Sequence, residues 1–175
     1  MNILIDDIPF NKSLFPFGEV RSMAHVRLGI FTLFEKWQFY FPGKIFIESE
    51  KLIHDYNETE CIKYPANFIP SNSFLKEISK ANRKIAFAPD CKILDHPWQI
   101  FEYNDWAIRQ DFGMITNEKT SEKIPVSNQA ICPGNIFIEN GASVSCSVLN
   151  AEAGPIYIGK NVEIQEGCLL RGPIA

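Results

Sequence analysis

The residues best suited to chemistry lie near the amino terminus, where two acidic side chains close a short apolar run. Asp6 and Asp7 directly follow residues 1–5, which have the composition of a β-strand. α/β sheets bind their ligands at the ends of strands, and paired carboxylates suit Mg²⁺. A solvated turn before Pro9 is the competing interpretation, and the absence of glycine from residues 6–17 favours it.

Two arginines follow this pair, at positions 21 and 27. The planar guanidinium of Arg21 or Arg27 can donate two parallel hydrogen bonds to a phosphate group. The alternative is that both arginines carry charge on the surface of a helix. The sequence leaves these two interpretations open.

The histidines indicate no second reactive site. His25 and His54 have no recognisable partner, so a role at the surface or at the edge of the core is expected. His96 is expected to cap a helix. No histidine follows it, so the carboxyl-terminal repeats cannot supply the general base of an acyltransferase.

Five cysteines occur without metal-binding or disulfide spacing, which predicts free thiols in a reducing cytoplasm. The three in the carboxyl-terminal part are expected to be packing residues rather than nucleophiles. These three are Cys132, Cys146 and Cys168.

From about residue 126 to the last residue, the chain repeats every six residues. Apolar residues recur at this spacing, with Gly, Asn, Ser, Glu and Lys between them and a slip near residues 150–155. A six-residue period with turn residues inside it predicts short strands wound into a parallel β-coil. The residues predicted to point inward are Val126, Cys132, Ile138, Val144, Ile158, Ile164 and Leu170.

Before this repeat, the pattern predicts a β–α–β unit. Strands are expected at residues 1–5 and 44–48, as parallel neighbours, with a helix between them capped by Ser22. The helix would end at Pro42 and Gly43. Its apolar stripe would be Val26, Ile30, Leu33, Phe34 and Trp37.

The next part of the chain predicts further short elements, although residues 49–70 show no clear pattern. A helix should begin near residues 70–73, with Phe74, Leu75 and Ile78 on one side, and residues 84–88 should form a strand. A second helix should begin at Asp95 or His96, with Pro97 in its first turn. Its apolar side would be Trp98, Phe101 and Ile108, with Trp37, Trp98 and Trp106 as core or interface anchors.

The composition limits the class of protein. The chain has 175 residues and a net charge of −4, which argues against nucleic acid or an anionic membrane as the main partner. Its apolar stretches are short and interrupted by charge, so no transmembrane helix is expected. The first seven residues lack the basic region of a secretory signal. A cytoplasmic protein is therefore predicted.

Three stretches together resemble one known family. The hexads resemble the left-handed parallel β-helix of hexapeptide-repeat transferases. Residues 96–104, His-Pro-Trp-Gln-Ile-Phe-Glu-Tyr-Asn, are similar to the helix that joins a sugar-1-phosphate nucleotidyltransferase domain to such a β-helix. Residues 3–7, 21–29 and 35–37 are similar to the start of the divergent sugar nucleotidyltransferases common in the Bacteroidetes. Those proteins resemble N-acetylglucosamine-1-phosphate uridylyltransferase/acetyltransferase and glucose-1-phosphate thymidylyltransferases.

The resemblance implies an α/β amino-terminal part followed by an all-β, left-handed parallel β-helix. The amino-terminal, nucleotidyltransferase-like domain would span residues 1–95. A linker helix and connection would occupy residues 96–125. An incomplete β-helix built of hexapeptide repeats would occupy residues 126–175, and the family further implies a homotrimer.

The same resemblance implies a transferase that moves a nucleotidyl group from a nucleoside triphosphate to a sugar 1-phosphate, such as glucose 1-phosphate or N-acetylglucosamine 1-phosphate. Its partners would be a nucleotide and a sugar phosphate, with Mg²⁺ as cofactor and no protein-held metal site. Asp7 and Arg21 would take catalytic roles. Asp6 and Arg27 would bind the substrate.

The chain departs from the family pattern in four ways. The glycine-rich signature G-G-x-G-T-R is missing, and Met23 or Ala24 stands near the position of the family's later lysine. Only about 95 residues precede the linker, whereas such domains usually need about 150 or more. The repeat also stops without a capping unit. We therefore expect very weak or no catalysis, and we expect the chain to correspond to the front part of a longer family pattern. The alternative function is that of a non-catalytic trimeric scaffold or a sugar-nucleotide-binding module.

Overall fold

The structure, a computed structural model, divides the chain into two compact units, Met1–Tyr103 and Asn104–Ala175. Helices and several short parallel strands give the chain the mixed α/β content that the sequence predicts. Among the described residues, no helix is both long and apolar enough to cross a membrane. The residues that the structure describes are 2–10, 14–41, 43–48, 61–81 and 83–175.

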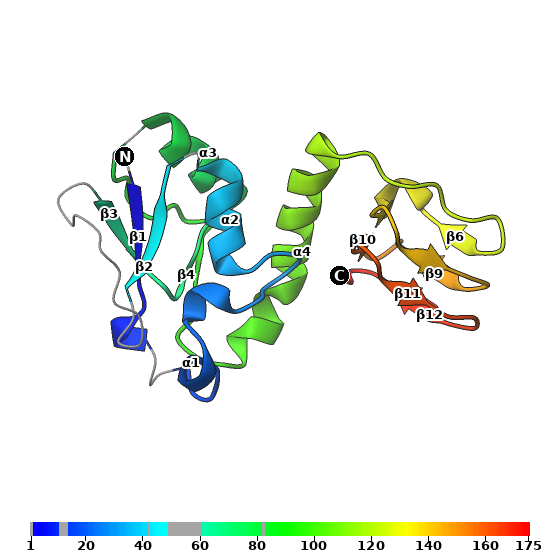
Figure 1. The fold of residues 1–175 in the computed structure, drawn as a ribbon, viewed down its shortest axis with the longest axis horizontal. Helices are drawn as coiled ribbons and strands as arrows, with labels where there is room; N and C mark the ends of the chain where they lie inside the picture. Colours follow the sequence, from blue (N-terminus) through cyan, green and yellow to red (C-terminus); the bar gives the residue numbers. More distant parts are fainter. Residues whose placement is uncertain (1, 11–13, 42, 49–60, 82) are drawn as a thin grey trace. The chain divides into compact units, whose positions relative to one another are not determined.

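A three-stranded parallel sheet forms the centre of the first unit (Figure 1). Strand β1 (Asn2–Asp6) lies between β2 (Ile45–Glu48) and β3 (Cys61–Pro65) and is parallel to both. Ile3 and Ile5 on one face of β1 and Leu4 on the other are all buried, so this central strand is covered on both faces. The predicted parallel pairing of the first two strands is confirmed. Strand β3 lies in a segment where the sequence shows no clear pattern.

The helix between β1 and β2 is shorter than predicted. Helix α2 spans Leu33–Tyr40 and is capped by Thr32, whereas Ser22 caps only the single 3-10 turn η2 (Met23–His25). Gly29, with φ of 82°, interrupts helical geometry between them. The predicted start at Ser22 was therefore wrong. Val26 and Ile30, which belong to the predicted apolar stripe but precede α2, are nevertheless buried.

The remaining elements of the first unit are short. Helix α3 (Asn72–Ala81) buries Phe74, Leu75 and Ile78, as predicted. The predicted strand at residues 84–88 was wrong, because that segment is irregular. A different pair, β4 (Phe68–Ile69) and β5 (Lys92–Ile93), forms an antiparallel ladder instead. The short helical elements η1 and α1 span Ile8–Phe10 and Phe17–Val20.

Aromatic side chains fill the core of the first unit. The ring of Trp37, which is 2% exposed, lies 5.1 Å from the ring of Tyr64 and 6.2 Å from that of Phe74. The ring of Phe68 lies 5.1 Å from that of Phe74. These tilted and edge-to-face contacts fix α2 and α3 to the strands on which they pack.

Helix α4 (Gln99–Glu118) buries a different face from the one predicted. Ala107, Ile108 and Met114 are buried, but Trp98 and Phe101 are 57% and 77% exposed. The buried face lies in the later turns of the helix, so the two early aromatics point to solvent and are not core anchors. The side chain of Gln99 accepts the backbone N–H groups of Asp95 and His96, the two residues predicted at the cap.

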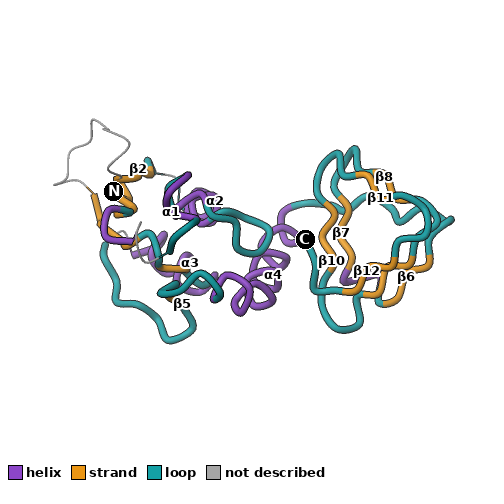
Figure 2. Tube along the Cα trace, turned by 90° about the horizontal axis from the view of Figure 1, so that it is seen from below, coloured by secondary structure: helices purple, strands orange, loops and turns teal. Residues whose placement is uncertain are grey.

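Three parallel ladders make up the strand structure of the second unit. Strand β7 pairs with β10, and β8 pairs with β11 (Figure 2). Strand β9 lies between β6 and β12 (Figure 1). In the first ladder, Ile136 pairs with Ile156, twenty positions later in the sequence. Each ladder therefore joins one pass of the chain, meaning one run through the successive strands of the unit, to the next pass. The elements are β6 (Gln129–Ile131), η4 (Pro133–Asn135), β7 (Ile136–Ile138), β8 (Ser143–Val144), β9 (Val148–Asn150), β10 (Ile156–Ile158), β11 (Glu163–Ile164) and β12 (Leu169–Arg171).

Most of the predicted inward positions of the repeat are confirmed. Ile138, Val144 and Ile158 are buried in one cluster, and Ile164 and Leu170 pack against it. The same cluster contains four residues that the inward set omits, namely Ile136, Leu149, Ala151 and Ile156.

The prediction that Val126 and Cys132 point inward was wrong. The prediction that the cysteines of this unit are packing residues was also wrong for Cys132 and Cys146. Val126 is fully exposed in a turn before β6. Cys132 and Cys146 are exposed at corners, with left-handed φ angles of 55° and 46°, so they turn the chain rather than fill the core. Cys168 is half-buried.

Candidate cleft of Arg21 and Arg27

A cleft of about 420 Å³ lies in the first unit, and Arg21 and Arg27 both line it. The other lining residues are all apolar: Pro16, Phe17, Val26 and Ile100. A cleft of this size and composition, with a few polar groups on apolar walls, is typical of small-molecule sites. The two arginines that the sequence singles out therefore lie together, but Asp6 and Asp7 do not line this cleft.

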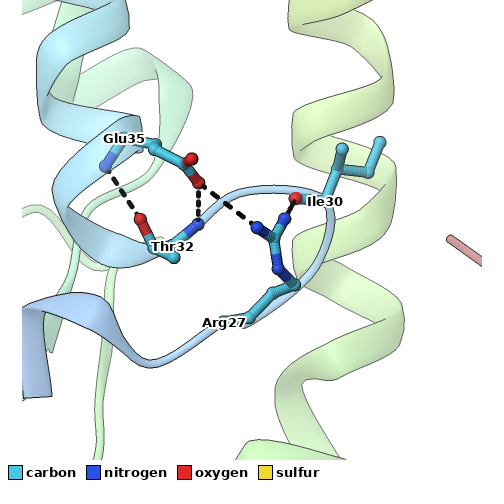
Figure 3. A network of polar contacts seen from close by, with 4 residues as sticks. All are labelled: Arg27, Ile30, Thr32 and Glu35. Atoms are coloured by element: carbon cyan, nitrogen blue, oxygen red, sulfur yellow. Dashed lines mark hydrogen bonds and ion pairs between the residues drawn. The ribbon is translucent and has the colours of Figure 1, made fainter. Parts of the chain in front are cut away.

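The guanidinium of Arg27 is held by the segment that follows it (Figure 3). Its Nη1 donates to the carbonyl oxygen of Ile30, and its Nη2 lies 3.8 Å from Oε2 of Glu35. The side chain of Arg27 remains 61% exposed, so its charge is accessible to a ligand. The alternative that Arg27 sits on a helix surface was wrong, because the residue precedes α2.

Arg21 follows helix α1 in extended backbone conformation, with φ of −148° and ψ of 161°. It is exposed, and its side chain has no ion pair or hydrogen bond within the described part of the chain. An unengaged guanidinium beside apolar walls is suited to bind an anionic group.

Asp7 anchors the segment between the two arginines. Its side chain is fully buried, and Oδ1 accepts the backbone N–H of Met23 at 3.0 Å. Oδ2 has no hydrogen-bond partner among the residues described. Burial raises the pKa of the Asp7 carboxyl, and hydrogen bonds from Ser22 and Met23 oppose this only in part. The favoured interpretation of a solvated turn was therefore wrong for Asp7.

Asp6 belongs to an ion-pair cluster at the end of the sheet. Its Oδ2 lies 3.1 Å from Nζ of Lys63, which lies 2.6 Å from Oε2 of Glu48. The hydrogen bond to Glu48 is the main cause that raises the pKa of Lys63. The carboxylate of Asp6 therefore faces an ammonium group from β3.

The two carboxylates do not fit a shared Mg²⁺ site in this arrangement. Mg²⁺ needs octahedral oxygen ligands and usually keeps several waters, whereas Asp6 faces a lysine and Asp7 is enclosed by protein. Within the described part of the chain, no three His, Cys, Asp or Glu side chains group closely enough to hold a metal ion.

Neither of the two histidines that the structure describes lines the cleft. The ring of His25 lies 5.5 Å from that of Phe34, and the ring of His96 stacks on Trp98 at 4.4 Å. His54 lies outside the described residues.

One residue near the cleft, Glu35, escaped the sequence analysis, although its signal was present. Thr32 and Glu35 have the spacing of a capping box, in which a Ser or Thr precedes a Glu by three residues. Recognising that pair would have placed the start of α2 correctly and a carboxylate near Arg27. The apolar lining residues carry no such signal in sequence.

Replacing Asp7 with asparagine tests its burial. An aspartate with a raised pKa binds its proton more tightly when folded, so its contribution to stability is lost as pH rises from 3.8 through the folded pKa. The variant cannot ionise. We expect the variant to gain stability relative to wild type between a pH below 3.8 and neutral pH, so that its free energy of unfolding becomes larger relative to that of the wild type. Urea denaturation at both pH values measures the two unfolding free energies, and Asp95→Asn, at an exposed position, is the control. If the difference in unfolding free energy between Asp7→Asn and the wild type did not change with pH, the raised pKa of Asp7 would be contradicted.

A scan of the chain against protein-family models found no match, and a search of the curated proteins found none either.

Proposed function

We propose that this chain is a divergent relative of the sugar-1-phosphate nucleotidyltransferases, and that its first unit binds a sugar phosphate or a sugar nucleotide. The observation that carries the proposal is the common cleft of Arg21 and Arg27. A guanidinium binds phosphate oxygens through paired, charge-assisted hydrogen bonds. Two such groups lining one cleft favour a phosphorylated ligand over a neutral one.

The apolar lining supports a ligand with an uncharged body beside its phosphate. Phe17 is 39% exposed, so part of its ring is available for stacking on a nucleobase or the apolar face of a sugar. The cleft volume of about 420 Å³ lies within the range of small-molecule sites. Its lining thus suits the two halves of a sugar phosphate or nucleotide.

The reaction that the resemblance implies is attack of a sugar 1-phosphate oxygen on the α-phosphorus of a nucleoside triphosphate, with release of pyrophosphate. In this chemistry the protein mainly positions phosphates and stabilises charge. Arg21 would stabilise the phosphate directly, whereas Asp7 would act through the Met23 N–H that it holds. Mg²⁺, arriving with the nucleotide, would neutralise phosphate charge.

We propose that this activity is very weak or absent in the chain. Residues 6–17 contain no glycine, so they lack the flexible backbone N–H groups that cradle phosphates in the family. Asp6 is engaged by Lys63 and Asp7 is enclosed. Because neither carboxylate is available to a ligand, the site supports binding more than catalysis. The alternative function is therefore that of a sugar-nucleotide-binding module without catalytic activity.

For the second unit we propose a left-handed parallel β-helix that assembles the protein as a homotrimer. Three parallel ladders around one apolar cluster support the β-helix. Cyclic symmetry would cover the partly apolar outer faces of these ladders. Light scattering of the intact chain checks the trimer directly, and a stable monomer at micromolar concentration would contradict it.

The described cysteines are all free, which is compatible with the reducing cytoplasm that we propose as the location.

Arg21→Ala tests the proposed function. The experiment is a thermal-shift titration with UTP, dTTP, UDP-glucose and glucose 1-phosphate in the presence of Mg²⁺, with pyrophosphate release measured in parallel. A true ligand should raise the melting temperature of the wild-type protein with increasing concentration. Removing one charge-assisted contact should weaken binding about tenfold or more.

Arg83→Ala is the matched control, because Arg83 is exposed in the same unit and does not line the cleft. Its titration curves should match those of the wild-type protein. Equal affinity in Arg21→Ala and Arg83→Ala, or no stabilisation of the wild-type protein by any of these ligands, would rule out the proposed site.

A further inference from the structure

The two arginines of the cleft differ in how much charge they can offer to a ligand. Arg27 already has a carboxylate partner, with its Nη2 3.8 Å from Oε2 of Glu35. Arg21 has no such partner within the described part of the chain. Among the described residues, the cleft therefore has one arginine without a carboxylate partner and one whose charge is partly neutralised by Glu35.

The capping box of helix α2 holds Glu35 in place (Figure 3). Its Oε2 accepts the backbone N–H of Thr32 at 2.7 Å, and Oγ1 of Thr32 accepts the backbone N–H of Glu35 at 3.2 Å. The atom that faces Arg27 is thus the same oxygen that caps the helix. The carboxylate cannot turn away from an incoming anion without losing the cap.

We propose that Glu35 is a specificity-determining residue, which makes the cleft favour ligands with a single phosphate group over nucleoside triphosphates. The inference rests on the proposed function, because it concerns the same cleft. The negative charge of Glu35 repels a bound anion, and this repulsion grows with the charge of the ligand. Built-in repulsion of the wrong ligand is a general source of specificity.

The size of the effect is limited by solvent. The carboxylate of Glu35 is 44% exposed and the guanidinium of Arg27 is 61% exposed, so water screens both charges. The repulsion should therefore change affinity by small factors, and it should be clearest at low ionic strength, where the screening length is long.

Glu35→Gln separates the charge from the cap. Glutamine can accept the same Thr32 N–H, so the helix should keep its capping box. UMP and UTP, which share base and ribose and differ in charge, are the probes, titrated calorimetrically at low salt with EDTA. We expect a gain of about twofold for UMP and about fivefold for UTP.

Two further variants act as controls. Glu77→Gln changes the net charge equally at an exposed position of α3, and it should leave the ratio of UTP to UMP affinity unchanged. Thr32→Ala removes the other half of the capping box, so it should lower the melting temperature without changing that ratio.

The outcomes separate this inference from the proposed function. An unchanged ratio in Glu35→Gln, or equal weakening of both nucleotides, would overturn the role of Glu35, while loss of binding in Arg21→Ala would still support the cleft. If neither nucleotide binds the wild-type protein, the role of Glu35 fails, whereas the proposed function fails only if glucose 1-phosphate and UDP-glucose do not bind either.

Discussion

Replacing Trp37 with alanine should lower the unfolding free energy of the first unit by about 3–5 kcal/mol. The side chain is 2% exposed, and its ring packs against Tyr64, Phe68 and Phe74. Removing it leaves a cavity beside the rings of Tyr64 and Phe74, into which the surrounding structure relaxes only in part. Urea denaturation followed by near-ultraviolet circular dichroism measures the loss.

Trp98→Ala is the matched control for this substitution. Trp98 is 57% exposed and contacts the ring of His96 by stacking, so its removal should change stability by about 0.5 kcal/mol or less. A loss from Trp98→Ala as large as that from Trp37→Ala would mean that the early turns of α4 are buried after all, as the sequence predicts.

Leu149→Ala should destabilise the second unit by about 2–5 kcal/mol. Leu149 is fully buried on the central strand β9, where it faces Ala130 of β6 and Leu170 of β12. Its side chain therefore bridges three successive passes of the chain. Denaturation at constant protein concentration measures the change, because assembly would add a concentration-dependent contribution.

Leu169 provides the control within the same ladder. It lies one residue from Leu170 on β12 but is 79% exposed, since neighbouring residues on a strand point to opposite sides. We expect a change of about 0.5 kcal/mol or less for Leu169→Ala. A large loss there would show that another surface covers this residue, and equal losses at both positions would contradict the inward direction of Leu149.

The elements that the sequence predicts well are those whose local pattern and burial agree. Helix α3 follows its turn residues and buries Phe74 and Ile78, and β1 and β2 pair as two apolar runs should. The start of α2 was missed because Val26 and Ile30 have helical spacing but are buried from irregular backbone. Apolar spacing alone therefore located core residues there, not the helix.

The candidate site could be predicted only in part. Arg21 and Arg27 were found because a guanidinium suits phosphate whatever its backbone conformation, and both reach the same cleft. The burial of Asp7 could not be found, since it depends on the N–H of Met23, sixteen positions later. Contacts between distant parts of the chain leave no local pattern in the sequence.

The ladders of the second unit keep their register although successive passes differ in length. The pass from Gln129 to Val148 is two residues shorter than the pass from Val148 to Leu169. One added residue lies at the corner before β12, where Gly167 adopts a φ of 80°, and Ile164 still faces Val144. Corners thus accommodate single extra residues while the paired strands stay in register, and we expect related chains to differ in length at these corners. An alignment that assumes a strict period would lose such relatives at these corners.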